Sequence, residues 1–531
     1  MFEFGRNDLF KKRHSVQSVV TKPTVHGRNA AMQDATRVNR YLAIIVRMTG
    51  YELLLEVGPI LLRIGRLTYL FRQGEISPST MFRFESELQN LLRELGRRIM
   101  EWTLNRLEPE ERSEMPGQLL WAGDYYRRRK KSPLRNLNCL FGPIKLSRFC
   151  DQPLETCGKC LFPLEIQLGI VCGVSTPALA DWVAREAVDL TQRQLLDQLR
   201  SHHVVWGVET LRKVTHAMVE MLSIHRQEAQ VQQVLHWLKQ AEKSKGPRRF
   251  TLSAGRDGVM IPMVRQSKYK EACTATVSVL DRCGRRIGTV YLGQMPQAYQ
   301  VTLSTNLTML LQEILARWDG ALPRLVYVTD CGSHPTAYFE EVLSKMPNPR
   351  QPMQRLEWEW IVDYYHACQY VTELAEAIFG PGRAAFAWSA KQRKILKERS
   401  GGIFRVLRSA GALRAIRGLI GSEEDYHKAY RYLRSRTSKM DYRTYRHFRL
   451  PIGSGVTEAA CKIVFTQRFK LSGMKWKLEG GSDILSLRII ALSRIWTQVR
   501  RRALESLPMP KPITHTTQHT QLAENRPKIV I

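Results

Sequence analysis

Hydrophobic and polar positions alternate along this chain with two different periods. From Asp34 to Leu107 the hydrophobic residues follow the spacing of several amphipathic helices. A sharper helical pattern lies between 177 and 224, where Pro177 can open a first helix and two more follow over 190–199 and 208–219. A short helix, a turn and a polar-faced helix form the layout of a helix-turn-helix unit, although any helical hairpin gives the same pattern.

From Arg249 the period falls to two, which is typical of strands. A meander of three strands is predicted over 250–264, 273–280 and 286–292. A helix, a strand, a helix and a strand then follow, over 301–317, 324–329, 334–345 and 356–362. This is the element order of a ribonuclease H-like fold, in which the first and fourth strands lie side by side. We therefore expect an α+β or α/β chain with a ribonuclease H-like core, an all-helical insertion in that core, and a mostly helical region before it.

Changes in pattern and composition predict six segments. The insertion is the most basic of them, with 18 Lys and Arg against five Asp and Glu. The segments are a flexible basic N-terminus (1–35), a mostly helical region (36–245), the first part of the core (246–380), the insertion (381–450), the completion of the core (451–505) and a disordered tail (506–531).

The net charge of the chain limits the classes of binding partner that we expect. The 531 residues include 81 Lys and Arg against 49 Asp and Glu, a formal net charge of +32. Such a chain is attracted to nucleic acid or to an anionic membrane. No apolar run approaches the roughly 18 residues of a membrane span, and no secretory signal is visible. We therefore expect a cytoplasmic protein whose partner is double-stranded DNA, not a membrane.

Ten cysteines in so long a chain do not indicate a disulfide framework. Cys157 and Cys160 form a CxxC pair, and Cys139 and Cys150 precede it at irregular spacing. These four residues are candidates for a structural zinc site, but a strong zinc signal needs a second CxxC or a His pair. Ordinary thiols beside a glycine turn are the alternative.

Three carboxylate residues are candidates for a catalytic site that binds metal ions. Asp257 and Asp330 each end an apolar strand, and Glu458 follows a Gly-Ser-Gly turn at the start of a helix. Such a trio can bind two Mg²⁺ or Mn²⁺ ions for phosphodiester chemistry. Asp363 also ends a strand, so it competes with Asp330 for the second place, and Glu458 could instead form a surface pair with Lys462.

Several basic and aromatic side chains are candidate DNA contacts. The run Tyr125–Lys131 is either a solvated loop or a phosphate contact, and the insertion is either a phosphate-tracking surface or a solvated helical hairpin. Trp476 can stack on a base or belong to the core. The candidates are Thr210, Arg212, Lys213 and His216 in the predicted recognition helix, Lys391, Arg393, Lys394 and Lys397 in the insertion, and Arg468, Lys470, Lys475 and Trp476 near the end of the core.

Three segments in this order resemble the transposases of Kra-type insertion sequences. They are Arg256–Pro262, Val362–Ala367, and Leu450–Lys462 together with Arg468–Trp476. The resemblance covers roughly residues 140 to 500 and implies a DDE transposase of a prokaryote, working with Mg²⁺ on the terminal inverted repeats of its element. Carried over by position, the catalytic triad falls on Asp257, Asp330 and Glu458.

The same resemblance places Asp363 and His366 beside the site. It implies a nucleoid-associated protein, which we expect to act as a homo-oligomer on DNA. A DNA-binding protein derived from a mobile element, without strand-transfer activity, and a plain ribonuclease H-like endonuclease are the alternatives. The sequence contains no phosphate loop of the GxxxxGK[ST] type and no recognisable nucleophile elbow, which disfavours nucleotide hydrolysis and Ser-His-Asp chemistry.

Overall fold

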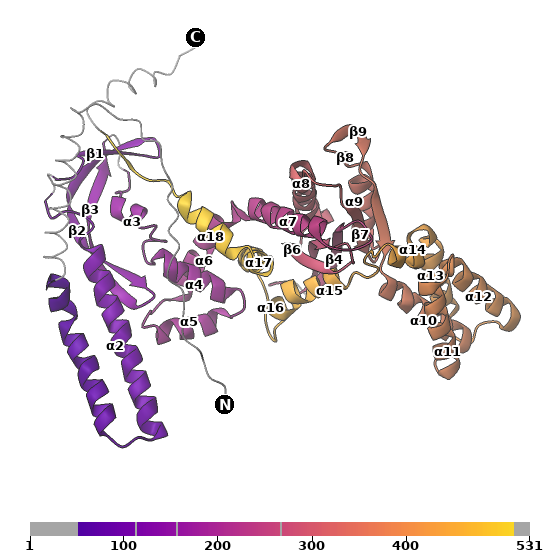
Figure 1. Cartoon of the computed structure of the whole chain (residues 1–531), viewed down its shortest axis with the longest axis horizontal. Helices are drawn as coiled ribbons and strands as arrows, with labels where there is room; N and C mark the ends of the chain where they lie inside the picture. Colours follow the sequence, from indigo (N-terminus) through magenta and orange to yellow (C-terminus); the bar gives the residue numbers. More distant parts are fainter. Residues whose placement is uncertain (1–50, 112–113, 155–157, 266–267, 514–531) are drawn as a thin grey trace, which may run out of the picture. The chain divides into compact units, whose positions relative to one another are not determined.

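The computed structural model describes residues 51–111, 114–154, 158–265 and 268–513 (Figure 1). The chain divides into two compact units, residues 1–106 and 107–531, which are described separately. The predicted N-terminal segment 1–35, Cys157 and most of the predicted tail lie outside the described residues. Secondary structure confirms a mixed α/β chain rich in helix.

Unit 1 is a helical hairpin of helix 51–73 and α2 (Pro78–Leu104). Ser77 caps α2 with its side chain, and Pro78 occupies the first turn, so the sequence fixes where this helix begins. Buried apolar residues lie between the two helices, including Val57, Ile60 and Leu91. The helices expected here are confirmed.

Unit 2 begins with a sheet in a region that was expected to be mostly helical. The strands β1 (Gln118–Trp121), β2 (Asp124–Cys139), β3 (Gly142–Pro153) and β11 (Lys511–Pro512) form an antiparallel sheet in the order β11-β1-β2-β3. The region predicted to be mostly helical, 36–245, therefore also contains, among its described residues, three strands that were not predicted. The disordered-tail prediction is wrong for β11, because Pro512 pairs with Leu119.

The charge run 125–131 belongs to β2 and is not a loop. Arg128 is buried, and its Nε donates to Asp151 Oδ1 of β3 at 3.2 Å. A buried guanidinium needs such a partner, because an unpaired charge in the interior is strongly destabilising. Arg128 therefore stabilises the hairpin and is not free to contact phosphate.

A helical layer follows: α3 (Pro163–Gln167), α4 (Pro177–Ala187), α5 (Gln192–Ser201), α6 (Val208–Ser223) and α7 (Arg226–Lys243). The helices expected over 177–219 are present. Their core is shared with α17 (Leu478–Leu492) and α18 (Trp496–Glu505) through Leu487, Ile490 and Trp496. Residue 245 is thus not a boundary between two separately packed bodies.

The second sheet has five strands: β4 (Thr251–Ile261), β5 (Lys270–Leu280), β6 (Arg286–Gln294), β7 (Arg324–Thr329) and β10 (Trp358–Val362). Their order is β10-β7-β4-β5-β6. The β4–β5–β6 meander is antiparallel, whereas β7 is parallel to β4 and β10 is parallel to β7. The expected strand and helix order is therefore present in this sheet.

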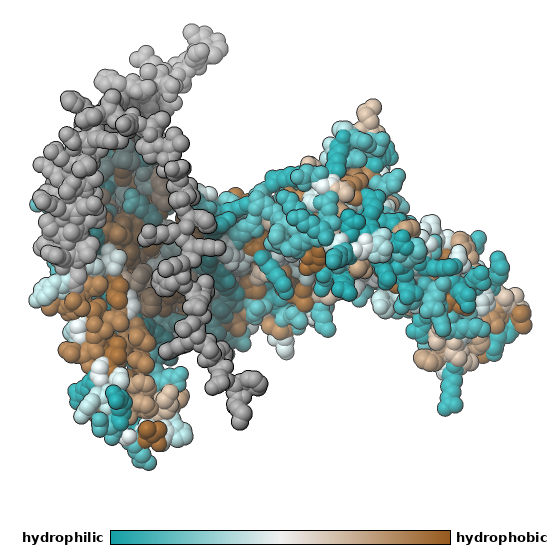
Figure 2. Space-filling model, in the orientation of Figure 1, coloured by the Kyte–Doolittle hydropathy of each residue, from teal (hydrophilic) through white to brown (hydrophobic). Residues whose placement is uncertain are grey.

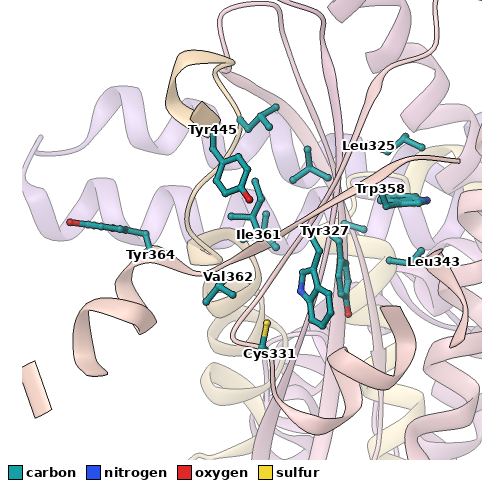
Figure 3. Packing of buried hydrophobic residues seen from close by; sticks show 14 of the residues in the cluster. Leu325, Tyr327, Cys331, Leu343, Trp358, Ile361, Val362, Tyr364 and Tyr445 are labelled. Carbon is teal, nitrogen blue, oxygen red and sulfur yellow. The ribbon is translucent and has the colours of Figure 1, made fainter. Parts of the chain in front are cut away.

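Helices cover both faces of this sheet. Trp237 of α7 packs against Gly288 on one face of β6, and Leu485 of α17 packs against Gly293 on the other. The crossovers between strands are η2 (Ala298–Gln300) with α8 (Val301–Arg317), and α9 (Ser333–Glu341) with η3 (Leu343–Lys345), followed by a small hairpin of β8 (Pro347–Asn348) and β9 (Gln351–Arg355). Tyr327 is fully buried on β7, in the hydrophobic cluster shown in Figure 3. Its ring packs against those of Tyr338, Phe339 and Trp360.

Residues 364–450 are helical as expected. They form α10 (Tyr364–Phe379), α11 (Arg383–Glu398), α12 (Gly402–Arg417), α13 (Glu423–Arg434), η4 (Thr437–Lys439) and α14 (Tyr442–His447). The chain then returns to the sheet through α15 (Gly455–Ala460), the π-helical turn η5 (Cys461–Thr466) and α16 (Gln467–Phe469). Within the described residues, no helix is long and apolar enough to cross a membrane.

Candidate active site

The register of β4 and β7 brings two of the predicted carboxylates to one place. Ala254 of β4 is level with Tyr327 of β7 in a parallel pair. Asp257 and Asp330 each follow three residues later, so both lie at the same edge of the sheet and face the same side. Asp330 is half-buried, and its Oδ1 accepts a hydrogen bond from Gly332 N at 2.9 Å.

Helix α15 brings Glu458 to the same edge. Its neighbour Thr457 is buried and shares a 2.9 Å hydrogen bond with Thr276 of β5. A Cβ at Gly255 would lie 2.2 Å from Thr457 Oγ1 and 3.1 Å from Val328 O. Only glycine at this point of β4 therefore lets α15 approach the sheet so closely. The two Gly-containing motifs thus pack directly against each other.

The three carboxylates influence one another electrostatically. Burial raises the pKa of Asp257 to about 6, and the charges of Asp330 and Glu458 act in the same direction. Hydrogen bonds from the Cys461 thiol (3.3 Å to Oδ2) and Gly258 N (2.8 Å to Oδ1) lower this pKa. The site therefore concentrates negative charge in a partly desolvated place, which is favourable for a bound cation.

Asp363 is level with Asp330, because Val362 pairs with Thr329 in the parallel β10–β7 ladder. Its carboxylate, however, is fully buried and saturated. Oδ1 accepts from Tyr365 N (2.5 Å) and His366 N (3.0 Å), which caps α10. Oδ2 accepts from the backbone N (2.5 Å) and the hydroxyl of Ser454. Asp363 therefore ties α10 to the loop before α15.

Ser454 also reaches the glutamate. Its Oγ lies 2.9 Å from Glu458 Oε1, and its carbonyl accepts from Glu458 N at 2.9 Å. The single hydroxyl proton of Ser454 can be donated to only one of Asp363 and Glu458 at a time. No ion pair between Glu458 and Lys462 occurs in the part of the chain described here, although both side chains are exposed. The surface Glu–Lys alternative is therefore not what positions Glu458; the Asp363–Ser454 pair does so.

Helices of the insertion hold the turn after Asp330. Cys331 has a left-handed backbone (φ +60°), an unfavourable conformation for a residue with a side chain. The Tyr432 hydroxyl donates to Asp330 O at 2.6 Å, and Arg436 donates to Cys331 O at 3.2 Å. The His366 ring lies against Tyr432 with 5.8 Å between centroids. His366 thus lies beside this turn and supports it through Tyr432.

Metal-binding geometry is not preformed. Among the described residues, no group of three or more His, Cys, Asp or Glu side chains could hold a metal ion.

For the predicted zinc site, Cys150 and Cys160 interact directly, and burial raises the pKa of Cys150 to about 11. Cys139 sits beside the β2–β3 turn at Gly142, about eight residues or roughly 26 Å along β3 from Cys150. Cys139 therefore cannot complete a four-cysteine site, and Cys157 lies outside the described residues.

Two predicted DNA contacts after Glu458 are part of the core. Arg468 is buried, donates to Leu190 O at 2.7 Å, and has its pKa lowered to about 10 by burial. Trp476 packs on Phe469 and donates from Nε1 to its carbonyl at 3.1 Å. Burial therefore overturns the phosphate-clamping role predicted for Arg468, whereas for the partly buried Trp476 these contacts favour the alternative that it belongs to the core. Lys470 and Lys475 are exposed.

Of the four basic residues of α11 that were predicted to contact DNA, two are exposed and two make contacts within the fold. Lys391 and Lys394 are exposed. Arg393 bonds back to Ser389 of its own helix (3.1 Å to Oγ), and the Lys397 ammonium lies 5.3 Å from the centre of the Tyr364 ring. Only the first two are therefore available to phosphate without breaking a packing contact.

The predicted recognition helix α6 presents a mixed face. Arg212 is exposed and contacts Gln192 at 3.2 Å, and Thr210 is partly exposed. Lys213 pairs with Glu209 at 2.7 Å. His216 Nδ1 lies 3.0 Å from Asp483 of α17, which raises the histidine pKa. These acidic partners offset much of the positive charge of the helix, so Arg212 is its best-placed free cation within the described residues.

Sequence reasoning missed Ser454, Thr457, Cys461 and Tyr432. The first three flank Glu458 within one motif, and their proximity in sequence was the available signal. Tyr432 lies 102 residues from Asp330, and no sequence pattern indicates that contact.

Comparison of the chain with models of known protein families and with curated proteins found no match.

Proposed function

We propose that this chain is a DDE-type DNA transposase whose five-stranded sheet is a ribonuclease H-like core. The observation that carries the proposal is the β4–β7 register, which puts Asp257 and Asp330 at one sheet edge. Their electrostatic influence on each other and that of Glu458 support the same conclusion. The strand order β10-β7-β4-β5-β6 agrees with the expected fold.

The three carboxylates supply hard oxygen donors of the kind that Mg²⁺ and Mn²⁺ prefer. Asp257, Asp330 and Glu458 would hold such ions, whose Lewis acidity would supply activation of a water or 3′-hydroxyl and stabilisation of the leaving oxygen in an in-line displacement at phosphorus. The chain orients each of the three donors separately, without preforming a complete metal site among the described residues. Cys461 and Gly258 orient Asp257, Gly332 N orients Asp330, and Ser454 orients Glu458.

Double-stranded DNA is the proposed substrate, in the nucleoid of a prokaryotic cell. The net charge of +32 favours such a polyanion. Exposed Lys470 and Lys475 follow Glu458 in sequence, and Lys391 and Lys394 lie on α11. Within the α5–α6 pair, the proposed helix-turn-helix, Arg212 is the side chain that we assign to DNA contact.

The decisive experiment incubates the full chain, with Mg²⁺, and DNA that carries the inverted repeats flanking its reading frame. Transposase activity gives both cleaved and joined products. Asp257→Asn, Asp330→Asn and Glu458→Gln should each abolish both products while retaining DNA binding. If Asp330→Asn cuts normally and Asp363→Asn does not, the assignment of the second ligand is wrong.

The same assay separates the alternatives. Cleavage without joined products indicates a ribonuclease H-like endonuclease. Binding to the repeats without cleavage, in Mg²⁺ and in Mn²⁺, indicates a DNA-binding protein derived from a mobile element. Arg212→Ala tests the DNA-reading assignment: the loss should be larger on the repeats than on random DNA if the side chain touches bases, and equal on both if it touches only phosphate.

A further inference from the structure

Helix 51–73 of unit 1 is apolar on two opposite faces. Its inner face meets α2: Val57 and Ile60 are buried, and the Phe71 ring stacks on Phe84 with 4.3 Å between centroids. A surface helix of a globular protein needs only one such stripe, with polar residues opposite. Brown hydrophobic atoms nevertheless cover much of the outside of this hairpin in Figure 2.

The second stripe, here called the outer stripe, runs along the face opposite α2. Its large side chains recur at the a, d and e positions of nearly three heptads. They are Tyr51, Leu54, Leu55, Leu61, Leu62 and Tyr69, with exposed fractions from 43% to 77%. Gly58 and Gly65 take two of the a positions, and a Cβ added to either would have nothing within 4 Å. Another helix could therefore approach closely along this stripe.

The stripe is long enough for a stable helix pair. It extends from Tyr51 to Tyr69, which corresponds to about 27 Å of helix. If each of the six large side chains gives up roughly 100 Å² in each of two copies, the pair buries about 1,200 Å², the lower end of the range for stable interfaces. A single two-helix hairpin cannot cover this stripe itself, because α2 already occupies the opposite face.

Charge on the same helix favours one orientation of a second copy. The first half carries Glu52 and Glu56, and the second half carries Arg63, Arg66 and Arg72. Within the hairpin Glu52 pairs with Arg106, just after α2, at 2.7 Å, and Glu56 lies 4.0 Å from Arg98 of α2. Both glutamate side chains nevertheless stay about half exposed, so each can also face an arginine of a second copy. Antiparallel self-pairing puts the acidic half of one helix beside the basic half of the other. Parallel self-pairing instead puts like charges side by side, which disfavours it.

We propose that the outer stripe of helix 51–73 binds the outer stripe of a second copy of this chain in antiparallel orientation. Two hairpins then form a four-helix bundle with two-fold symmetry. The interface forms without DNA and is independent of the carboxylate site, so its failure and the failure of the proposed catalytic function are separate results.

The first test measures the mass of the full-length protein, freed of nucleic acid, by sedimentation at micromolar concentration. The native chain should be a dimer, and Leu62→Glu should weaken the dimer about tenfold or more, because a charge replaces an apolar contact. Ile416→Glu is the matched control, since Ile416 of unit 2 is similarly exposed. A monomeric native chain, or equal effects of both variants, would overturn the proposal.

The second test measures orientation. In an antiparallel pair the middle of the stripe meets itself and its ends do not. Oxidation of Leu61→Cys should therefore give much more reducible dimer than the native cysteines give, and Tyr69→Cys should give no such increase. Equal cross-linking of both variants would mean parallel pairing and overturn the antiparallel assignment. An absence of cross-linking in Leu61→Cys would also overturn the proposal, because another occupant, such as residues 34–50 of the same chain, would then cover the stripe.

Discussion

The buried charge of Asp257 has a cost that a single substitution should reveal. Its pKa rises from 3.8 to about 6 in the fold, chiefly by burial and then by Asp330 and Glu458. The native state therefore binds more protons than the unfolded chain between about pH 4 and pH 6, so stability falls as the pH rises through this window. Above pH 6 the ionised carboxylate costs about 3 kcal/mol, because each tenfold change in proton affinity corresponds to about 1.4 kcal/mol.

Asp257→Asn removes this cost at nearly constant volume. The amide oxygen can still accept from Gly258 N, whereas the contact with the Cys461 thiol is weakened. In metal-free buffer with a chelator, the variant should gain about 1 kcal/mol at pH 4.5 and up to about 3 kcal/mol at pH 7.5. The same variant should be unable to cleave DNA.

The assay is thermal unfolding across this pH range, followed by intrinsic fluorescence. Asp363→Asn is the matched control, because it makes the same change at the next strand end. It should lower stability by about 1–3 kcal/mol, since an amide nitrogen cannot accept the hydrogen bonds that the Asp363 oxygens accept. If Asp257→Asn leaves the melting temperature at pH 7.5 unchanged or lower, Asp257 does not carry a costly buried charge and the reasoning fails.

Three further outcomes are expected. Gly255→Ala should lower stability by about 1–3 kcal/mol and impair cleavage, because the new methyl group meets Thr457 Oγ1; unchanged unfolding would show that α15 packs less closely. Ser454→Ala should raise the Mg²⁺ concentration needed for cleavage with little effect on DNA binding, because Glu458 loses its 2.9 Å partner; an unchanged Mg²⁺ dependence would contradict this positioning role. Replacing Lys391 and Lys394 together by Gln should flatten the plot of log affinity against log salt by up to about 1.8, at about 0.9 for each phosphate contact; an unchanged slope would mark α11 as a solvated helix.

Much of the core could be predicted because its signals are local. The meander and the alternating strands and helices follow from hydrophobic period alone, and their bounds in the fold differ from the expected ones by only a few residues. The β2–β3 hairpin was missed because its charged run hides the alternation. Arg128 looks like a surface cation in sequence, and only its buried partner Asp151 reveals its place in the sheet.

Asp330 and Asp363 show why the residues of the active site were harder to predict from the sequence than the strands of the core. Both end parallel strands at the same level, so period and motif cannot rank them. What separates them is the set of atoms around each carboxylate: Asp363 is saturated by a helix start and by Ser454, whereas Asp330 stays half-exposed. The phosphate contact predicted for Arg468 failed for the related reason that burial depends on distant segments.

The sequence by itself determined the helices and strands of the five-stranded sheet and of the insertion, which carboxylates end those strands, and that the chain carries a large positive charge. These properties depend on neighbours within a few residues or on simple addition. Tertiary structure alone decided which of these residues meet. The β4–β7 register, the approach of Thr457 to Gly255 and the hold of Tyr432 on the Asp330 turn all join residues dozens to hundreds of positions apart. Such contacts form because close packing of the whole chain allows only one arrangement of these segments. A pattern of neighbouring residues does not predict that arrangement.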